Sequence, residues 1–308
     1  MQNKDWFEQN SARFSGELRR DEPLLRHTYY RIGGPATVFA VPKTLEDLCW
    51  LSEGIRATGI PYFILGLGSN VLVADRGYSG LVIRTSRLNL EVGPLEKSPE
   101  TIRTGASVAI SSLLRKAAQH GWSGLAFLTG IPGSVGGVVF MNGGTHLGEA
   151  KDRLLAVDVF NMGGHDLTRF ERDALHFEYR RNLFVPEGGI VFSAEWKIDR
   201  ADPAQVKALI DETLARRKTT QPIDFPSCGS VFKNPKEKGM SAWQVVDQVR
   251  LRGHRIGGAQ IADKHSNFIL NLGNATAQDV RALIDLAKER AQDQLGIALE
   301  EEVRYVGF

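Results

Sequence analysis

The chain has 308 residues, 42% of them hydrophobic and 24% charged, and its 38 basic and 36 acidic side chains give a net charge of +2. This length allows two or three domains with cores of their own, and the charge balance does not favour nucleic acid or a membrane surface as partner. The two cysteines lie far apart, and the seven histidines have no metal-ligand spacing. We therefore expect free thiols in a reducing compartment and no metal site.

The first part of the chain has an α/β pattern. Thr44 to Asp47 forms a capping box, apolar residues follow at helical spacing, and Gly59 is a stop signal. A short apolar run over residues 60–65 predicts a buried strand, and residues 71–73 predict another. Between them lies the segment Gly66-Leu67-Gly68-Ser69-Asn70. Glycines in such a turn allow the backbone to approach a ligand.

The middle of the chain contains a long uncharged segment. A helix is expected within residues 104–121, and residues 121–145 contain no charged side chain, which is long enough for a membrane span. Nine glycines fall between residues 121 and 148, however, and Pro132 lies among them. A lipid-exposed helix would not tolerate so many breakers, so we predict a buried glycine-rich backbone. Strands are predicted over 156–160 and 190–198.

The C-terminal part, from about residue 200, has an α+β pattern. Asp202-Pro203 opens a helix whose expected apolar face contains Val206, Leu209, Ile210 and Leu214. Capping boxes begin at Ser241 and Thr276, a strand is expected over 266–272, and Gly296 ends the last helix. The closing strand, residues 297–306, alternates apolar residues with Glu300, Glu302 and Arg304. Glu300 is interpreted as part of a solvated edge.

The segment from Ser227 to Pro235 has the strongest chemical pattern. Gly229 permits a tight turn, and Ser230 adds a hydroxyl that can donate or accept a proton. Lys233 and Asn234 supply donors that suit an anionic, oxygen-rich ligand. If this pattern stood alone, the alternative interpretation would be a surface turn closed by Pro235.

Two glycine clusters, residues 66–70 and 130–137, offer bare backbone N–H groups of the kind that hold a diphosphate. Neither cluster matches the P-loop or the GxGxxG fingerprint. Each cluster by itself is also compatible with close packing of a strand against a helix. Together, and followed by Asn142-Gly143-Gly144, they favour a large dinucleotide held across several loops.

These motifs occur in an order that resembles the family of UDP-N-acetylenolpyruvoylglucosamine reductases (MurB), from about residue 28 to residue 304. The resemblance is carried by His27-Thr28 with Ile32 to Ala36, the two glycine clusters, Tyr179-Arg180-x-x-x-Phe184, the Cys228 to Pro235 loop, and Leu299-Glu300-x-Glu302-Val303-Arg304. The first of these also resemble the wider group of flavoproteins with the same fold, whereas the last three point to the reductase.

The resemblance implies an α+β protein with an FAD-binding fold of the PCMH/vanillyl-alcohol-oxidase type, made of two α/β subdomains, plus a C-terminal α+β substrate domain. The expected boundaries are 1–85 with the closing strand 297–308, 86–199, and 200–296. It also implies non-covalent FAD, NADPH as hydride donor, and reduction of UDP-N-acetylglucosamine enolpyruvate to UDP-N-acetylmuramate for peptidoglycan synthesis. A cytoplasmic monomer that binds this small substrate, but no nucleic acid or membrane, is expected.

The same resemblance supplies candidate site residues. Arg180 would meet the charge that develops at the substrate carboxylate, Ser230 would protonate the neighbouring carbon, and Glu302 would lie beside the same carboxylate with a raised pKa. Substrate contacts are expected from Arg180, Ser230, Lys233, Asn234 and Arg304, although an ion pair between Arg304 and Glu302 is an equal alternative. Cofactor contacts are expected from Gly66, Gly68, Ser69, Asn70, Val71, Leu72, Gly130, Ile131, Pro132, Gly133, Ser134, Gly136, Gly137, Asn142, Gly143 and Ile190.

Two departures from the family pattern are visible. Asn182 stands where many members have serine, and the short distance from Arg180 to Ile190 leaves no room for the tyrosine-bearing insertion of one class. The chain therefore resembles the shorter class, in which another group closes the site. Cys228 has no histidine partner nearby in sequence and is interpreted as a small loop residue. Another FAD oxidoreductase of this fold, or a non-catalytic flavin-binding module, remains the alternative.

Overall fold

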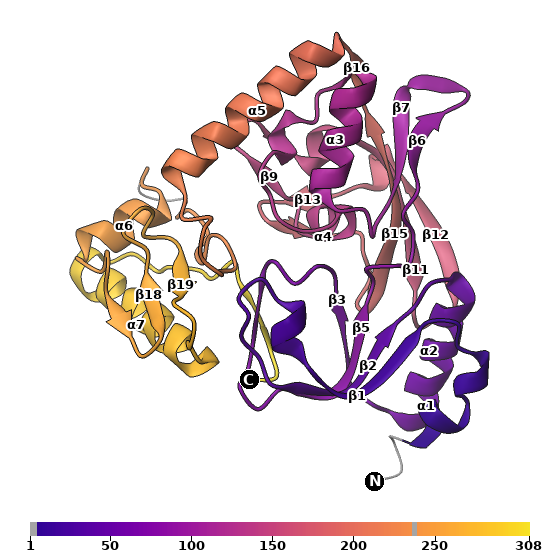
Figure 1. Ribbon diagram of the computed structural model, residues 1–308, viewed down its shortest axis with the longest axis horizontal. Coiled ribbons are helices and arrows are strands. Elements are labelled where there is room, and N and C mark those ends of the chain that lie inside the picture. The colour runs from indigo at the N-terminus through magenta and orange to yellow at the C-terminus, as the bar shows by residue number, and fades with distance from the viewer. Residues whose placement is uncertain (1–4, 236–238) are drawn as a thin grey trace. The chain divides into compact units, whose positions relative to one another are not determined.

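The computed structural model describes residues 5–235 and 239–308, which divide into two compact units. Unit 1 contains Thr37–Leu67, Gly80–Arg216 and the chain before Asp21. Unit 2 contains Asp21–Ala36, Gly68–Ser79 and Arg217–Phe308. Figure 1 shows the elements in chain order from indigo to yellow. The three-domain division expected from the sequence stays a prediction.

A four-stranded sheet and one amphipathic helix form the first core. The strand order is β1 (Glu17–Pro23), β2 (Pro35–Val41), β5 (Tyr78–Arg84), β3 (Tyr62–Leu65), with β3 and β5 parallel. Helix α2 (Leu45–Thr58) begins at the Thr44 capping box and ends at Gly59 in the left-handed conformation, as predicted. Trp50 of α2 is fully buried against Phe7 of α1 (Asp5–Gln9) and stacks on Phe14.

An antiparallel five-stranded sheet forms the second core of unit 1. Its order is β12 (Asp166–Glu171), β11 (Leu154–Asn161), β15 (Gly189–Lys197), β7 (Ser98–Gly105), β6 (Val92–Leu95). Helices α3 (Ile110–His120) and α4 (Val135–Phe140) pack their apolar side chains on it (Figure 1). Two-residue strands pair beside it: β8 (Trp122–Ser123) with β16 (Asp199–Arg200), β9 (Gly144–Thr145) with β10 (Gly148–Glu149), and β13 (Phe177–Glu178) with β14 (Arg181–Asn182).

The uncharged segment over residues 121–145 folds into short elements. It contains β8, a 3-10 turn at Ala126–Leu128, the six-residue helix α4 and β9. Within residues 5–235 and 239–308, no helix has both the length and the apolar character needed to cross a bilayer.

Unit 2 is built from two capped helices and a small sheet. Helices α6 (Ala242–Gln248) and α7 (Ala277–Leu295) begin at the predicted capping boxes of Ser241 and Thr276, and Gly296 ends α7 as expected. Their buried faces pack on the sheet β17 (Arg255–Ile256), β18 (Ala259–Ile261), β19 (Ile269–Asn271). Strands β4 (Val71–Val73) and β20 (Arg304–Val306) pair in parallel in the same unit.

The helix predicted after Asp202-Pro203 is present as α5 (Pro203–Thr220), but its expected apolar face is only partly buried. Val206 and Thr213 are buried, whereas Leu209 is 45% exposed. Ile210 packs at the edge of the core formed by the five-stranded sheet. The helix leads from one unit into the next, so only part of its length has a core to cover it.

Both C-terminal strands are shorter than predicted. The strand expected over 266–272 is regular only in β19, because Asn267 pairs with Phe232 instead of extending it. The strand expected over 297–306 is regular only in β20, and Glu301 forms an isolated bridge with Phe232. The predicted alternation does hold: Leu299 and Val303 are buried, and Glu300 is exposed.

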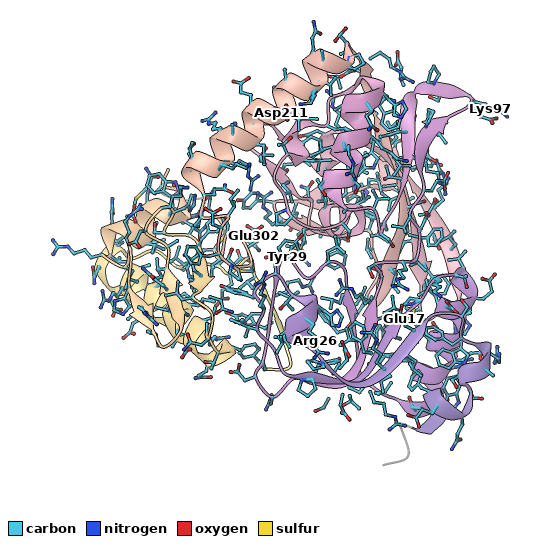
Figure 2. The ribbon with its side chains drawn as sticks, in the orientation of Figure 1. Glu17, Arg26, Tyr29, Lys97, Asp211 and Glu302 are labelled. Carbon is cyan, nitrogen blue, oxygen red and sulfur yellow. The ribbon has the colours of Figure 1, made fainter. Side chains whose placement is uncertain are left out.

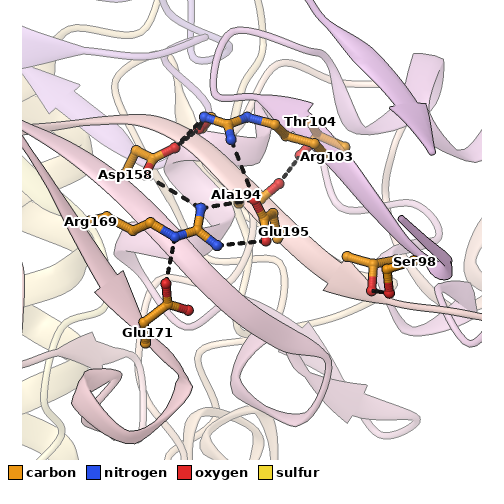
Figure 3. A network of polar contacts seen from close by, with 10 residues as sticks. Ser98, Arg103, Thr104, Asp158, Arg169, Glu171, Ala194 and Glu195 are labelled. Carbon is orange, nitrogen blue, oxygen red and sulfur yellow. Dashed lines mark hydrogen bonds and ion pairs between the residues drawn. The ribbon is translucent and has the colours of Figure 1, made fainter. Parts of the chain in front are cut away.

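Opposite charges face one another across four strands of the five-stranded sheet (Figure 3). Arg169 on β12 donates two hydrogen bonds of 2.8 Å to the carboxylate of Glu195 on β15. Arg103 on β7 pairs with Asp158 on β11 and lies 3.3 Å from Glu195. Hydrogen bonds from Arg169, together with the charges of Arg169 and Arg103, lower the pKa of Glu195.

We expect Glu195→Gln to lower the free energy of unfolding by about 1–3 kcal/mol at pH 7, because it breaks a bidentate charged pair. The folded-state pKa of Glu195 is depressed, so its stabilisation is present above the unfolded value of about 4.3 and is lost as the pH falls through the folded value. Urea unfolding of both proteins should therefore differ at pH 7 and converge in acid. The exposed Glu171, which contacts the same arginine, supplies the control Glu171→Gln, expected to cost under about 0.5 kcal/mol. A constant difference at all pH values would contradict this.

Candidate active site

In unit 2, the loop that contains Ser230 lies beside the segment that contains Glu302. The Glu302 N–H donates to the Val231 carbonyl at 2.7 Å, and the Lys233 N–H donates to the Glu300 carbonyl at 2.8 Å. Between these bonds, Phe232 and Glu301 form an antiparallel bridge. Glu302 is labelled in Figure 2. Two of the three predicted catalytic residues are thus brought together by backbone pairing.

The other edge of this loop is held by Asn267, a residue that the sequence did not single out. The Asn267 side chain donates to the Phe232 carbonyl and accepts from the Phe232 N–H, both at 2.9 Å. Its backbone carbonyl accepts from the Val231 N–H at 2.8 Å. The only sequence signal was a polar residue inside an apolar run predicted to be a strand.

Cys228 and Tyr30 form a buried pair next to this loop. Cys228 is 5% exposed and Tyr30 is fully buried. Burial raises the pKa of the Cys228 thiol to about 12, and the nearby negative charge of Glu302 adds to the rise. Burial also raises the pKa of Tyr30 well above its ordinary value, with a contribution from Cys228. A thiol in this state is a poor nucleophile, which supports its interpretation as a small loop residue.

Three predicted substrate contacts of unit 2, Lys233, Asn234 and Arg304, have partners within the chain. Lys233 pairs with the exposed Glu300, and the Asn234 side chain accepts from the N–H of Ala242 at the start of α6. The Arg304 N–H donates to the Asn70 carbonyl at 3.1 Å. These bonds fix Lys233 and Asn234 at the rim of the Ser230 loop, and their contact with substrate stays a prediction.

Asn70, predicted to contact the cofactor, is tied to the Glu302 segment. Its side chain donates to the Glu302 carbonyl at 3.0 Å, and β4 then continues in register with β20. Nearby, a Cβ at Gly68 would lie 2.0 Å from the His27 carbonyl oxygen at φ +73, so only glycine fits there. The segment that follows Gly68 is therefore part of the scaffold that holds Glu302.

Arg180, the third predicted catalytic residue, belongs to unit 1. Its guanidinium donates to the carbonyls of Gly144 at 3.3 Å and Asn142 at 3.5 Å, and lies 3.6 Å from the carboxylate of Glu149. It also lies over the ring of Tyr179 at 4.9 Å. Arg180 itself has φ +58, a backbone conformation uncommon for a residue with a side chain. The structure thus joins Arg180 to the end of the glycine-rich segment.

Two side-chain amides, the buried Asn142 and the half-buried Asn182, shape the backbone around Arg180. The Asn142 amide donates to Glu149 and to the Glu178 carbonyl and accepts from the Lys151 N–H, at 3.0 to 3.1 Å. The Asn182 amide donates to the Phe140 carbonyl at 2.7 Å and accepts from the Val185 N–H at 3.0 Å. Asn182, the departure from the serine of many family members, therefore holds the turn that precedes β15. A cofactor contact from Asn142 stays a prediction.

The two glycine clusters meet within unit 1 at Gly66 and Ser134. A Cβ at Gly66 would lie 3.3 Å from the Ser134 hydroxyl oxygen, and Gly133 has φ +126, which favours glycine. By contrast, a Cβ at Gly136 would come within 3.0 Å of the Ala106 Cβ, and the Gly136 N–H already donates to Ala106. Gly136 therefore serves packing, the alternative left open by the sequence. The bare backbone, the Ser134 hydroxyl and the lack of carboxylates over residues 121–145 fit a diphosphate group.

Three predicted cofactor residues have side chains inside a core. Leu72 is fully buried, Ile190 is 1% exposed and Val71 is 7% exposed. Any contact that they make with a cofactor would come chiefly from backbone atoms. Among the described residues, 5–235 and 239–308, no group of three His, Cys, Asp or Glu side chains could hold a metal ion.

Comparison with known proteins decides the family. A family model described as UDP-N-acetylenolpyruvoylglucosamine reductase, C-terminal domain, matches residues 221–306, and an FAD binding domain model matches residues 36–168. The UDP-N-acetylenolpyruvoylglucosamine reductase of Geobacter metallireducens is 40% identical over 305 residues, which cover 99% of each chain. The chain belongs to the UDP-N-acetylenolpyruvoylglucosamine reductase family. The UDP-N-acetylenolpyruvoylglucosamine reductase of Heliobacterium modesticaldum is 39% identical, over 96% of this chain and 92% of the relative's own length.

A solved structure agrees with this assignment to the UDP-N-acetylenolpyruvoylglucosamine reductase (MurB) family. The MurB structure from Thermus caldophilus has a TM-score of 0.77 and 36% identity, covering 94% of this chain and 98% of that one. These comparisons confirm the expected FAD-binding fold with a reductase C-terminal domain. They also confirm the FAD and NADPH cofactors and the oxidoreductase activity in UDP-N-acetylmuramate synthesis. The roles of single residues stay predictions.

We expect Cys228 to resist modification by thiol reagents in the folded protein, because its thiol is buried and its pKa is raised to about 12. The test uses the Cys49→Ser variant, in which Cys228 is the remaining thiol. At pH 8 a thiol reagent such as DTNB should label it at least about 10²-fold more slowly before unfolding than after, following the accessible thiolate fraction. Cys228→Ser is the matched control, since it leaves the partly exposed Cys49 to react. Rapid labelling of folded Cys49→Ser would contradict the burial of this thiol.

Proposed function

We propose that Arg180, Ser230 and Glu302 are the residues with which this chain reduces the enolpyruvyl ether of UDP-N-acetylglucosamine enolpyruvate. The observation that carries the proposal is the pairing of the Ser230 loop with the Glu302 segment through the 2.7 Å bond between Val231 and Glu302. Bound FAD supplies the hydride that reaches the methylene carbon of the substrate, and the glycine segments of residues 66–70 and 130–137 would hold it.

Ser230 is proposed as the general acid. After hydride addition to the methylene carbon, the adjacent carbon has carbanion character and needs a proton. A serine hydroxyl is a weak acid, yet it suffices for so strong a base. The hydroxyl stands directly after Gly229, whose φ of +80 gives the loop its turn, and directly before Val231, whose N–H and carbonyl are both bonded. These bonds support the proposal, because they restrain the backbone directly after Ser230.

Glu302 is proposed to lie beside the substrate carboxylate as a protonated carboxyl group that donates a hydrogen bond. A like charge nearby, here the substrate carboxylate, raises the pKa of a carboxyl group. Before substrate binds, burial and, in addition, the carboxylate of Glu302 raise the pKa of the neighbouring Cys228.

Arg180 is proposed to stabilise the negative charge that accumulates on the carboxylate as an enediolate. A guanidinium offers several donors in one plane and is always charged, so it matches a carboxylate geometry. The carbonyls of Asn142 and Gly144 hold the guanidinium in place. Lys233, Asn234 and Arg304 would contact other anionic or polar parts of the substrate.

Three further expectations belong to this proposal. The turn over residues 183–188, closed by Asn182 and by the Gly189 N–H bond to Pro186, supports the shorter class without the tyrosine-bearing insertion. We also propose that the enzyme is a monomer and works in the cytoplasm, where free thiols such as Cys49 and Cys228 are stable.

We expect Ser230→Ala to separate the two half-reactions. NADPH should bleach the flavin absorbance at the wild-type rate, because this step needs no proton from Ser230. Return of the colour on addition of UDP-N-acetylglucosamine enolpyruvate should be slower by about 10²–10⁴-fold, the usual contribution of a general acid. Anaerobic stopped-flow absorbance measures both rates, and Ser227→Ala, a hydroxyl in the same loop, is the control. Equal colour return in Ser230→Ala and wild type would rule out the assignment.

We expect Glu302→Gln to retain turnover within about tenfold of wild type. If ionisation of Glu302 lowers the kcat/KM of the wild-type enzyme in alkali, this decrease should be absent in the variant. Glutamine keeps a donor, whereas a deprotonated glutamate lacks one. The pH profile of kcat/KM measures this, with Glu301→Gln, whose native side chain pairs with Lys288, as control. A loss of several orders of magnitude in Glu302→Gln at all pH values would show that the charged form is required.

A further inference from the structure

Asn267 pairs with the Ser230 loop as a strand would. Its side chain forms two hydrogen bonds of 2.9 Å with the backbone of Phe232, one donated and one accepted. Its own carbonyl accepts from the Val231 N–H at 2.8 Å. The side chain is 4% exposed, so all of this polar surface is removed from water and must be satisfied within the chain.

The same two loop residues are bonded on their opposite edge to the Glu302 segment. The Val231 carbonyl accepts from the Glu302 N–H at 2.7 Å, and Phe232 forms a bridge with Glu301. Asn267 is therefore linked to Glu302 through a single peptide unit, and to Ser230 through the residue that follows it. A change in its amide geometry would shift both groups.

Restraint on Ser230 comes mainly from this side of the loop. On the other side, Gly229 is flexible by nature, and a Cβ built there would meet no described atom within 4 Å. Packing at Gly229 thus does little to restrain the turn before Ser230, whereas the bonds of Val231 and Phe232 restrain the chain directly after it. Asn has a donor and an acceptor at the distance needed to match one residue's N–H and carbonyl.

We propose that Asn267 is a positioning residue that sets Ser230 and Glu302 relative to each other for the proton-transfer step. It acts through the backbone of Val231 and Phe232 and does not affect the reduction of flavin by NADPH. The inference rests on the proposed roles of Ser230 and Glu302.

Asn267→Asp provides a sharp test, because protonated aspartic acid has the same shape as asparagine and keeps one donor and one acceptor. The ionised form has no donor for the Phe232 carbonyl, and burial should raise the pKa of this new carboxyl group. Relative to wild type at each pH, colour return with the enolpyruvyl substrate should be about 10–100-fold slower at pH 8 and should recover as the pH falls. Misplacement of a catalytic group by about 1 Å has effects of this size.

Other titratable groups on the contacting segments are common to variant and wild type, so the ratio of rates at each pH removes their effect. They are His265, Cys228, Lys233, Glu300, Glu301, Glu302 and Lys288. NADPH bleaching should stay within about twofold of wild type throughout, and bound FAD and the thermal midpoint are measured in parallel. Should Asn267→Asp fail to fold, Asn267→Ser should show the same split between half-reactions without recovery in acid.

Asn271→Asp is the matched control. Asn271 is also 4% exposed, in the same segment, but its side chain bonds to the Tyr30 carbonyl and to the N–H groups of Gly273 and Ala275. A similar loss of thermal stability with an unchanged ratio of half-reaction rates is expected. Because Asn267 acts on Ser230 as well as on Glu302, combining Asn267→Asp with Ser230→Ala should slow colour return by less than the product of the two separate slowdowns.

The outcomes separate the inference from the proposed function. Wild-type colour return in Ser230→Ala would overturn the assignment of Ser230 and the inference with it. Slow return in Ser230→Ala together with normal return in Asn267→Asp would overturn the inference alone. Equal slowing of both half-reactions in Asn267→Asp, or the same split in Asn271→Asp, would make Asn267 a purely structural residue.

Discussion

The backbone of Val231 and Phe232 is hydrogen-bonded along both edges, and the placement of the Ser230 loop beside the Glu302 segment depends on it. One edge is satisfied by Asn267 and the other by the Glu300–Glu302 segment. Because a buried N–H or carbonyl left without a partner costs about 1–3 kcal/mol, neither edge can be released cheaply. The backbone directly after Ser230 is therefore held by hydrogen bonds on both edges.

In unit 1, by contrast, the segment over residues 121–145 has no charged side chains of its own. The polar groups of this segment are mostly backbone N–H and carbonyl groups. The side-chain amides of Asn142, inside the segment, and Asn182, outside it, form hydrogen bonds that fix the course of its backbone. The guanidinium of Arg180 then docks on the carbonyls of Asn142 and Gly144. A permanent charge is thus placed next to an uncharged glycine-rich segment.

Local signals predicted most helix boundaries. The capping boxes at Thr44, Ser241 and Thr276 begin helices, and Gly59, Gly121 and Gly296 end them, because these interactions involve residues at most a few positions apart. The family motifs likewise gave Ser230 and Glu302 as candidates. The bond between Val231 and Glu302 places their two segments side by side, although the roles assigned to Ser230 and Glu302 stay untested.

The strand predictions over 266–272 and 297–306 were too long because their true partners are distant in sequence. Whether residue 267 extends a strand or bonds sideways depends on Phe232, 35 positions away. Periodicity records only which side of a segment is buried, not which groups satisfy its backbone. The predicted burial of Leu209 was wrong for a similar reason. Helix α5 has the apolar pattern of a core helix, but little of a core lies beside it.

The pairing of β4 with β20 has a consequence for the order of folding during synthesis. Asn70 and Glu302, bonded at the end of this pair, are 232 positions apart in sequence. A nascent chain therefore exposes the edge of β4 and the side chain of Leu72 throughout translation of the intervening residues. The carboxyl group of Glu302 takes its place only when that long loop closes. Completion of unit 2 is thus a late event, and an interrupted polypeptide contains the glycine clusters without the Glu302 segment that pairs with the Ser230 loop.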